Sequence, residues 1–363
     1  MHACAIEMDG ERMSFERIAP EQHDTLDGVP EPSETPRLVG HVQAASLLVA
    51  AYRAGKLPHA LILAGPVGIG KATLAFHLAH HLLKYPDYEV APEALAVPDQ
   101  ASSLFRQIAT GAYPSVLHLT RPLNEKTKTY KTVVTVDEIR KVSRFLSMTS
   151  HDGGYRVVIV DPADDMNANA ANALLKNLEE PPARTLFILV VHAPGSLLPT
   201  IRSRCQLVRL APLDADELMS VLDAVDQPVP ADPAARAALA KRAGGSIRNA
   251  ILLNQYGGVE IAENIDALIA AGKPDIAAAH RVAEAVSGRD RAIAFDIFNR
   301  RVLDLLSDAA GAAAQSGALG RAKKLSDTWQ EALNAISETE TYNLDKKQHA
   351  LMMIDRLNAA MRM

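Results

Sequence analysis

The sequence predicts an α/β domain with a parallel sheet, followed by domains built of helices alone. Between about residues 38 and 211, short apolar runs alternate with segments of helical periodicity, a pattern typical of a parallel sheet covered on both faces. After Pro212 the helical period continues without such runs. Composition agrees, because Ala and Leu are abundant and aromatic residues make up only 4% of 363 residues, which favours helices over an all-β fold.

The expected sheet strands are the short apolar runs. They cover residues 60–64, 116–119, 155–161, 185–191 and 205–210. The expected helices between them cover residues 41–56, 71–85, 134–148 and 167–180. In the first helix, the residues near one face are Val42, Leu47, Leu48 and Ala51. In the third, Thr135 and Glu138 have the spacing of a capping box.

The expected organisation has four parts. Residues 1–36 are acidic and proline-bearing without a sustained apolar period, so a poorly ordered arm is expected. Residues 37–211 form the α/β domain. Residues 212–272 are expected to form a small helical lid, and residues 273–363 a helical oligomerisation domain, for which a self-contained bundle is the alternative.

Charge and cysteine content exclude several classes of protein. The net charge is −5, whereas a protein that contacts many DNA phosphates is usually basic, so any nucleic-acid contact should be local or shared. Cys4 and Cys205 are the only cysteines, too few for a disulfide framework or a four-cysteine zinc site. The sequence shows neither a run of about 18 apolar residues nor a signal peptide, so a cytoplasmic location without membrane contact is expected.

The strongest chemical motif is a phosphate-binding loop. Gly65, Gly68, Gly70 and Lys71 follow an apolar strand and open a helix, the context that this motif requires. Glycine backbone N–H groups and the helix N-terminus can hold a phosphate, and the lysine can reach its outer oxygens. A glycine-rich turn without a ligand is the weaker alternative.

Two substitutions damage the expected ATPase site. The hydroxyl residue that binds Mg²⁺ after the lysine is replaced by Ala72, and Thr73 comes one residue, about 100°, too late. Asp161 ends an apolar strand as the expected metal-side carboxylate, but Pro162 stands where a Glu would polarise water. Weak binding of ATP or ADP is therefore expected, with doubtful Mg²⁺ coordination and little or no hydrolysis. Asp164 and Asp165 are expected to start or cap the next helix.

At this point the chain resembles the clamp-loader family of AAA+ ATPases. Four segments carry the resemblance: PHALILAGPVGIGK over residues 58–71, ANALLKNLEEPP over residues 171–182, Ser203-Arg204-Cys205, and the GSIRNA segment around Arg248. They occur in the family's order over about residues 37–260. Pro162 makes the chain similar to a subunit that does not hydrolyse ATP. Several relatives carry a four-cysteine zinc module that this sequence lacks, so no zinc is expected.

The resemblance implies a set of site residues. Arg204 matches the arginine that stabilises phosphoryl charge on a neighbour's ATP; an ordinary surface arginine is the alternative. His192 occupies the sensor-1 place, with a strand-end histidine as an equal alternative, and Arg248 the sensor-2 place. His77, His80 and His81 have metal-ligand spacing, but an ordinary helix face is favoured.

The resemblance also implies partners. A clamp loader is a five-subunit ring, so gamma/tau and delta subunits are expected as neighbours, with the sliding clamp and primed DNA reached through the assembly. The principal hypothesis is a structural and regulatory subunit that donates Arg204. The alternatives are an active AAA+ motor in DNA replication or repair, which Ala72 and Pro162 disfavour, and a nucleic-acid-binding module, which the negative charge disfavours.

Overall fold

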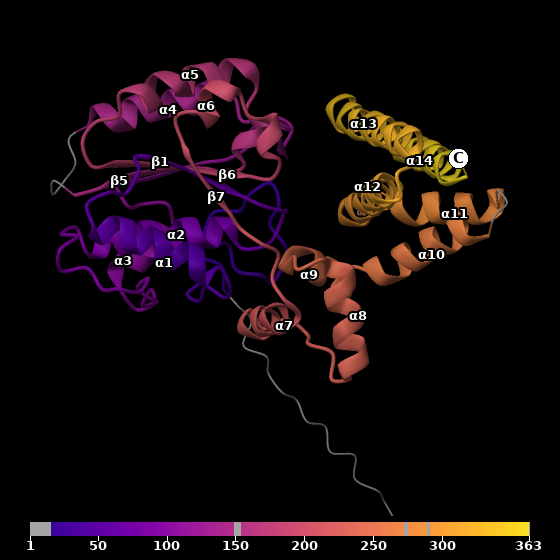
Figure 1. Ribbon diagram of the computed structural model, residues 1–363, viewed down its shortest axis with the longest axis horizontal. Coiled ribbons are helices and arrows are strands. Elements are labelled where there is room, and N and C mark those ends of the chain that lie inside the picture. Colours follow the sequence, from indigo (N-terminus) through magenta and orange to yellow (C-terminus); the bar gives the residue numbers. More distant parts are fainter. Residues whose placement is uncertain (1–15, 149–153, 272–274, 289–290, 363) are drawn as a thin grey trace, which may run out of the picture. The chain divides into compact units, whose positions relative to one another are not determined.

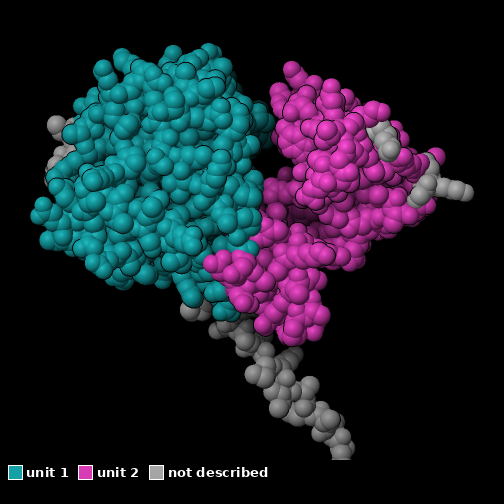
Figure 2. Space-filling model, in the orientation of Figure 1, with its two compact units in different colours: residues 1–213, 220–227 teal, residues 214–219, 228–363 magenta. Residues whose placement is uncertain are grey.

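The computed structural model describes residues 16–148, 154–271, 275–288 and 291–362. The chain forms two compact units, shown in different colours in Figure 2. Unit 1 comprises the chain up to Leu213 together with Ser220–Gln227, and unit 2 comprises Asp214–Met219 and Pro228–Met363. The residues of the two helical domains expected after residue 211 thus fall into one unit, apart from residues 212–213 and 220–227.

The core of unit 1 is a five-stranded sheet. Its strands are β1 (Ala60–Ala64), β2 (Val116–Leu119), β5 (Arg156–Val160), β6 (Thr185–Val191) and β7 (Gln206–Arg209). The strand order is β2-β5-β6-β1-β7, and every pairing is parallel. The expected α/β fold with a parallel sheet is confirmed.

Helices cover both faces of this sheet (Figure 1). One face carries α1 (Val42–Arg53), α2 (Lys71–Lys84) and α3 (Ser103–Ala109), and the other carries α4 (Val136–Ser147), α5 (Ala168–Glu179) and α6 (Pro199–Arg202). Side chains alternate along each strand, so the central strands β1, β5 and β6 contribute to both layers.

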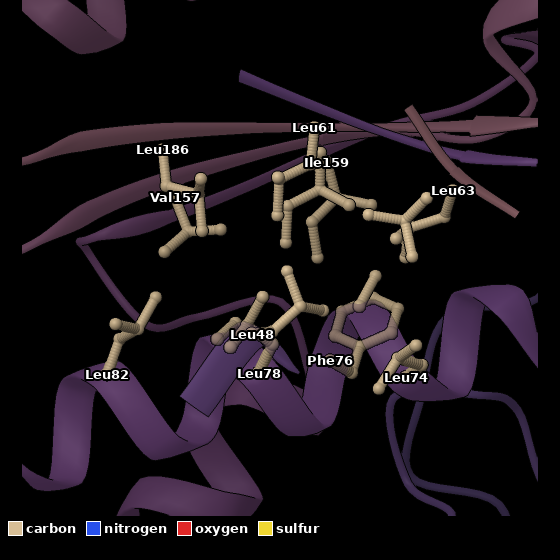
Figure 3. Packing of buried hydrophobic residues seen from close by; sticks show 14 of the residues in the cluster. Leu48, Leu61, Leu63, Leu74, Phe76, Leu78, Leu82, Val157, Ile159 and Leu186 are labelled. Atoms are coloured by element: carbon tan, nitrogen blue, oxygen red, sulfur yellow. The ribbon is translucent and has the colours of Figure 1, made fainter. Parts of the chain in front are cut away.

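Two apolar clusters result from this alternation. On β1, Leu61 and Leu63 belong to the cluster with α1 and α2 (Figure 3), while Ile62 belongs to the cluster with α4 and α5. All five residues of β1 are buried. Its carboxyl end is therefore held from both sides, which fixes the start of the glycine-rich loop that follows.

One local expectation for the helices was wrong, and a second was confirmed only for the position of the N-cap. In α1, Val42 and Leu47 are 70% and 62% exposed, and the buried face is formed by Ala45, Leu48, Val49 and Tyr52. In α4, Thr135 occupies the N-cap position, but its side chain makes no capping hydrogen bond. A short hairpin of β3 (Leu123–Asn124) and β4 (Thr129–Tyr130) precedes α4.

The N-terminal arm was expected to be poorly ordered, but residues 16–36 make defined contacts. Residues 1–15 lie outside the described residues. Buried Glu34 accepts backbone N–H groups of Ile18 and Ala19 at 2.9 and 3.1 Å. The Thr120 hydroxyl donates to the Gln22 side chain at 2.8 Å. Polar contacts, rather than an apolar period, hold this segment within unit 1.

Unit 2 is helical throughout its described residues. Its helices are α7 (Ala215–Ala224), of which Ser220–Ala224 belong to unit 1, α8 (Pro233–Ala243), α9 (Ile247–Gln255), α10 (Gly258–Ala270), α11 (Ile276–Val286), α12 (Ala292–Gln315), α13 (Leu319–Tyr342) and α14 (Lys346–Met361). One apolar cluster joins α10 to α14. Among the described residues, no helix is long and apolar enough to cross a bilayer.

A buried polar network connects the last three helices. His349 on α14 is 4% exposed, with Nδ1 2.8 Å from Thr339 Oγ1 on α13 and Nε2 2.9 Å from Asn299 Oδ1 on α12. Burial, with a smaller contribution from Arg356, lowers the pKa of His349 to about 4. The buried environment of His349 therefore favours the neutral imidazole.

This network predicts a pH-dependent stability of unit 2. Because the folded-state pKa of His349 is depressed, its contribution is complete above the unfolded-state pKa near 6.5 and is lost as the pH falls toward 4. Between pH 7 and pH 5, the wild type should lose about 2 kcal/mol more stability than His349→Gln, whose amide does not titrate. Urea unfolding followed by fluorescence of Trp329, the single tryptophan and a residue of α13, measures this difference. Equal losses in the two proteins would contradict it.

Candidate nucleotide site

The glycine-rich loop lies at the carboxyl end of β1. Strand β1 pairs with β6 on one side and β7 on the other, so the loop lies where the strand order reverses, the usual ligand position in open α/β sheets. A Cβ atom on Gly65 would lie 2.6 Å from the Leu210 carbonyl oxygen, which permits only glycine there. Gly70 has φ of 96° as the N-cap of α2, a left-handed conformation that suits glycine.

Lys71 is held by the loop itself. Its side chain is buried, and its Nζ donates to the carbonyl oxygen of Gly65 at 2.8 Å and also to that of Pro66. Burial lowers the pKa of Lys71 to about 8, against the opposing effect of Asp161 and Asp164. These contacts use two of the three N–H donors of the ammonium and leave one for a phosphate oxygen.

The carboxylates after β5 are occupied in ways that the sequence does not reveal. Asp164 Oδ2 accepts the backbone N–H groups of His192 and Ala193 at 3.0 and 2.9 Å. Asp165 pairs with Arg121 at 2.6 Å. Helix α5 is instead capped by Asn167, so the expectation that Asp164 or Asp165 caps it was wrong; both lie in a short 3₁₀ turn over Ala163–Asp165.

The residues present fit Mg²⁺ poorly. Ala72 offers no oxygen beside Lys71, and burial, together with Asp24, raises the pKa of Asp161 to about 7. A carboxyl group with that pKa is only partly ionised at neutral pH, whereas Mg²⁺ prefers charged oxygen ligands. Within the described residues, no group of three or more His, Cys, Asp or Glu side chains is placed to hold a metal ion.

The remaining candidate residues divide between the two units. His192 lies half-buried directly after β6, next to the strand that leads into the loop. Thr73 is half-buried on the first turn of α2. Arg248 lies on α9 in unit 2, so its role at the nucleotide stays a prediction. His41, which the sequence analysis did not single out, places Nε2 2.6 Å from the Ile69 carbonyl oxygen of the loop.

The three histidines of α2 have structural surroundings. His77, His80 and His81 are each at most 3% exposed. His77 Nε2 lies 2.9 Å from the Thr35 carbonyl oxygen, and His81 Nδ1 accepts the Ala96 N–H at 3.1 Å. They therefore face the interior of unit 1. His77 joins α2 to the arm, and His81 joins α2 to the segment that follows this helix.

Arg204 follows α6 at the surface of unit 1. Its side chain is 35% exposed, with Nη1 donating to the Thr200 carbonyl oxygen at 2.9 Å and Nη2 2.6 Å from Glu179 Oε1. Buried Ile201 and partly buried Cys205 anchor the backbone on either side. Arg202 is exposed.

Comparison with known proteins agrees with the motifs. Residues 40–214 match the family model described as DNA polymerase III, delta subunit. The DNA polymerase III delta-prime subunit of Pseudomonas aeruginosa is 41% identical over 147 residues, which are 40% of this chain and 41% of that protein. The delta-prime subunit of Escherichia coli K12 is 36% identical over 165 residues, 46% of each chain.

A related subunit matches more distantly. The DNA polymerase III tau subunit of Escherichia coli K12 is 27% identical over 218 residues, 60% of this chain and 32% of that protein. All three matches span less than half of the relative's length. Over residues 40–214, the chain is therefore similar to the delta-prime subunits of DNA polymerase III.

Proposed function

We propose that this chain serves as a delta-prime subunit of a bacterial clamp loader, helping to place a sliding clamp on primed DNA during replication. It acts by presenting Arg204 to ATP held in a neighbouring subunit, while its own nucleotide site contributes little or no hydrolysis. The observation that carries the proposal is the pairing of an anchored, partly exposed Arg204 with a phosphate loop that lacks the hydroxyl after Lys71.

The chemistry of Arg204 supports its part in this proposal. A guanidinium remains charged at neutral pH and presents planar N–H donors that match phosphoryl oxygens. Charge on those oxygens changes during phosphoryl transfer, and a fixed cation stabilises the transition state more than the ground state. Arg204 is partly exposed, and its hydrogen bonds and ion pair are made to Thr200 and Glu179.

The proposal implies defined partners. Gamma/tau and delta subunits would be the neighbours in the ring, and the clamp and primed DNA would be reached through the complete assembly in the cytoplasm. The net charge of −5 suits a subunit that shares its DNA contacts with others. ATP or ADP could bind weakly at the Lys71 loop without productive Mg²⁺ chemistry.

The second candidate is an active AAA+ motor. It has the glycine-rich loop in its favour, but Pro162 offers no proton acceptor, and the nearby carboxylates of Asp164 and Asp165 are engaged with backbone N–H groups and with Arg121. The nucleotide site of this chain therefore shows no clear substitute for the catalytic base that is missing at Pro162.

Reconstitution with partner subunits tests the proposed function. The purified chain is mixed with tau and delta subunits of the same bacterium, and assembly is followed by size-exclusion chromatography with light scattering. Loading of the sliding clamp on a primed circular DNA is then measured with and without the chain. We expect a stable complex and a large gain in ATP-dependent loading when the chain is present. Failure to co-assemble, or equal loading without it, would refute the proposal.

A further inference from the structure

The orientation of Arg204 is set by a residue from a different element. Glu179 is the last residue of α5, and its Oε1 lies 2.6 Å from Arg204 Nη2. On the other side of the guanidinium, Nη1 donates to the Thr200 carbonyl oxygen at 2.9 Å, one turn back in α6. Two acceptors from two helices thus hold one planar cation.

The backbone that carries Glu179 is held in place by buried contacts. The preceding residue, Leu178, is 1% exposed, and its carbonyl oxygen lies 3.1 Å from His59 Nε2. Pro181 and Pro182 end the helix immediately afterwards. The carbonyl end of a helix also carries a partial negative charge, which favours a cation placed there. Both the carboxylate and the helix end therefore draw Arg204 to the same place.

We propose that Glu179 is the positioning residue for the Arg204 finger: it holds the guanidinium over the end of α5 so that its remaining N–H donors are presented to a neighbour's phosphoryl oxygens. This inference rests on the proposed function. A guanidinium has five N–H donors, and the contacts with Glu179 and Thr200 leave three for phosphate. Glu179 thus stays bound while Arg204 acts, and fixes a side chain that otherwise samples many rotamers.

The exposure of the pair sets the size of the expected effect. Glu179 is 49% exposed and Arg204 35% exposed, and ion pairs so open to water contribute little to the stability of a fold. Loss of Glu179 should therefore leave the chain folded and assembled. It should lower kcat of the reconstituted loader by roughly 5-fold, with KM for ATP nearly unchanged, because ATP is held by the neighbour.

The ion pair is first tested in the isolated full-length chain. With arginine labelled by ¹⁵N and ¹³C and the Arg204 signals assigned from Arg204→Lys, restricted rotation of the guanidinium is measured by NMR. We expect restricted rotation in the wild type and in Glu180→Gln, a change at the next exposed residue, and faster rotation in Glu179→Gln. Equal rotation in Glu179→Gln and the wild type would overturn the positioning role.

A double-mutant cycle in the reconstituted loader then tests the consequence. Glu179→Gln should lower kcat when Arg204 is present and should cause no further loss in the Arg204→Ala background. A purely structural role of Glu179 would lower turnover in both backgrounds and would overturn the inference, as would higher turnover in Glu179→Gln alone.

The same cycle separates the two proposals. If Arg204→Ala lowers turnover strongly while Glu179→Gln matches the wild type, only the positioning role fails. If Arg204→Ala leaves turnover unchanged, the trans-acting finger fails and the positioning role fails with it.

Discussion

Replacing Arg204 by Ala is expected to lower ATP hydrolysis at the neighbouring site of an assembled loader by about 10³-fold or more, the range measured for arginine fingers in phosphoryl transfer. The change removes the guanidinium that the turn after α6 would direct at the phosphates. Because Arg204 is partly exposed and its backbone is anchored by Ile201 and Cys205, the fold should persist. Single-turnover hydrolysis with clamp and primed DNA measures the effect.

A matched control separates loss of the finger from loss of positive charge. Arg202→Ala removes an exposed arginine two residues earlier and should leave hydrolysis near the wild-type rate. Both variants should co-elute with the other subunits. Wild-type hydrolysis in an assembled Arg204→Ala loader would contradict the trans-acting role, and an equal loss in both variants would indicate a general effect of charge.

The strands were predictable because burial on both faces leaves a simple pattern. All seven residues of β6 are buried, and its sequence TLFILVV is apolar except for the first residue. The buried face of α1 was harder to predict, because Val42 and Leu47 are apolar yet exposed, while Tyr52 is 1% exposed. When most residues of a helix are apolar, the periodicity does not decide which face packs against the sheet.

The arm shows a different limit of sequence analysis. Glu31 and Glu34 indicate a solvated segment by composition, yet they are 5% and 4% exposed and accept hydrogen bonds from their own segment. In the folded chain, turns bring hydrogen-bond donors to these carboxylates, and the pattern of apolar residues does not predict such turns. Burial of Glu31 raises the pKa of its carboxyl group, as expected for such surroundings.

The candidate site was predictable where chemistry depends on adjacent residues. The loop from Gly65 to Lys71 has the context and backbone geometry that its motif implies. The partners of Asp164 and Asp165, and the Glu179 partner of Arg204, were not predictable, since each is distant in the sequence. The Glu179 contact spans 25 residues and depends on how α5 packs against α6.

The nucleotide site of this chain is expected to hydrolyse ATP no faster than the background rate without protein. Lys71 is bound to carbonyl oxygens of its own loop, Ala72 supplies no metal ligand, and Pro162 supplies no base. Asp164 is held away from a simple replacement of this base, because its Oδ2 accepts the backbone N–H groups of His192 and Ala193. Enzymes that transfer phosphoryl groups require a metal ligand and a residue that positions or activates the nucleophile, and this site lacks both.

We expect this chain to act on its neighbour's ATP and not on its own, and turnover by the purified chain tests whether it hydrolyses its own. Release of phosphate from ATP with Mg²⁺ is followed for the wild type and for Lys71→Ala, each free of other subunits. Our prediction is an equal, background rate for the two proteins. A clear wild-type turnover that Lys71→Ala abolishes would contradict it and would identify the chain as an active ATPase.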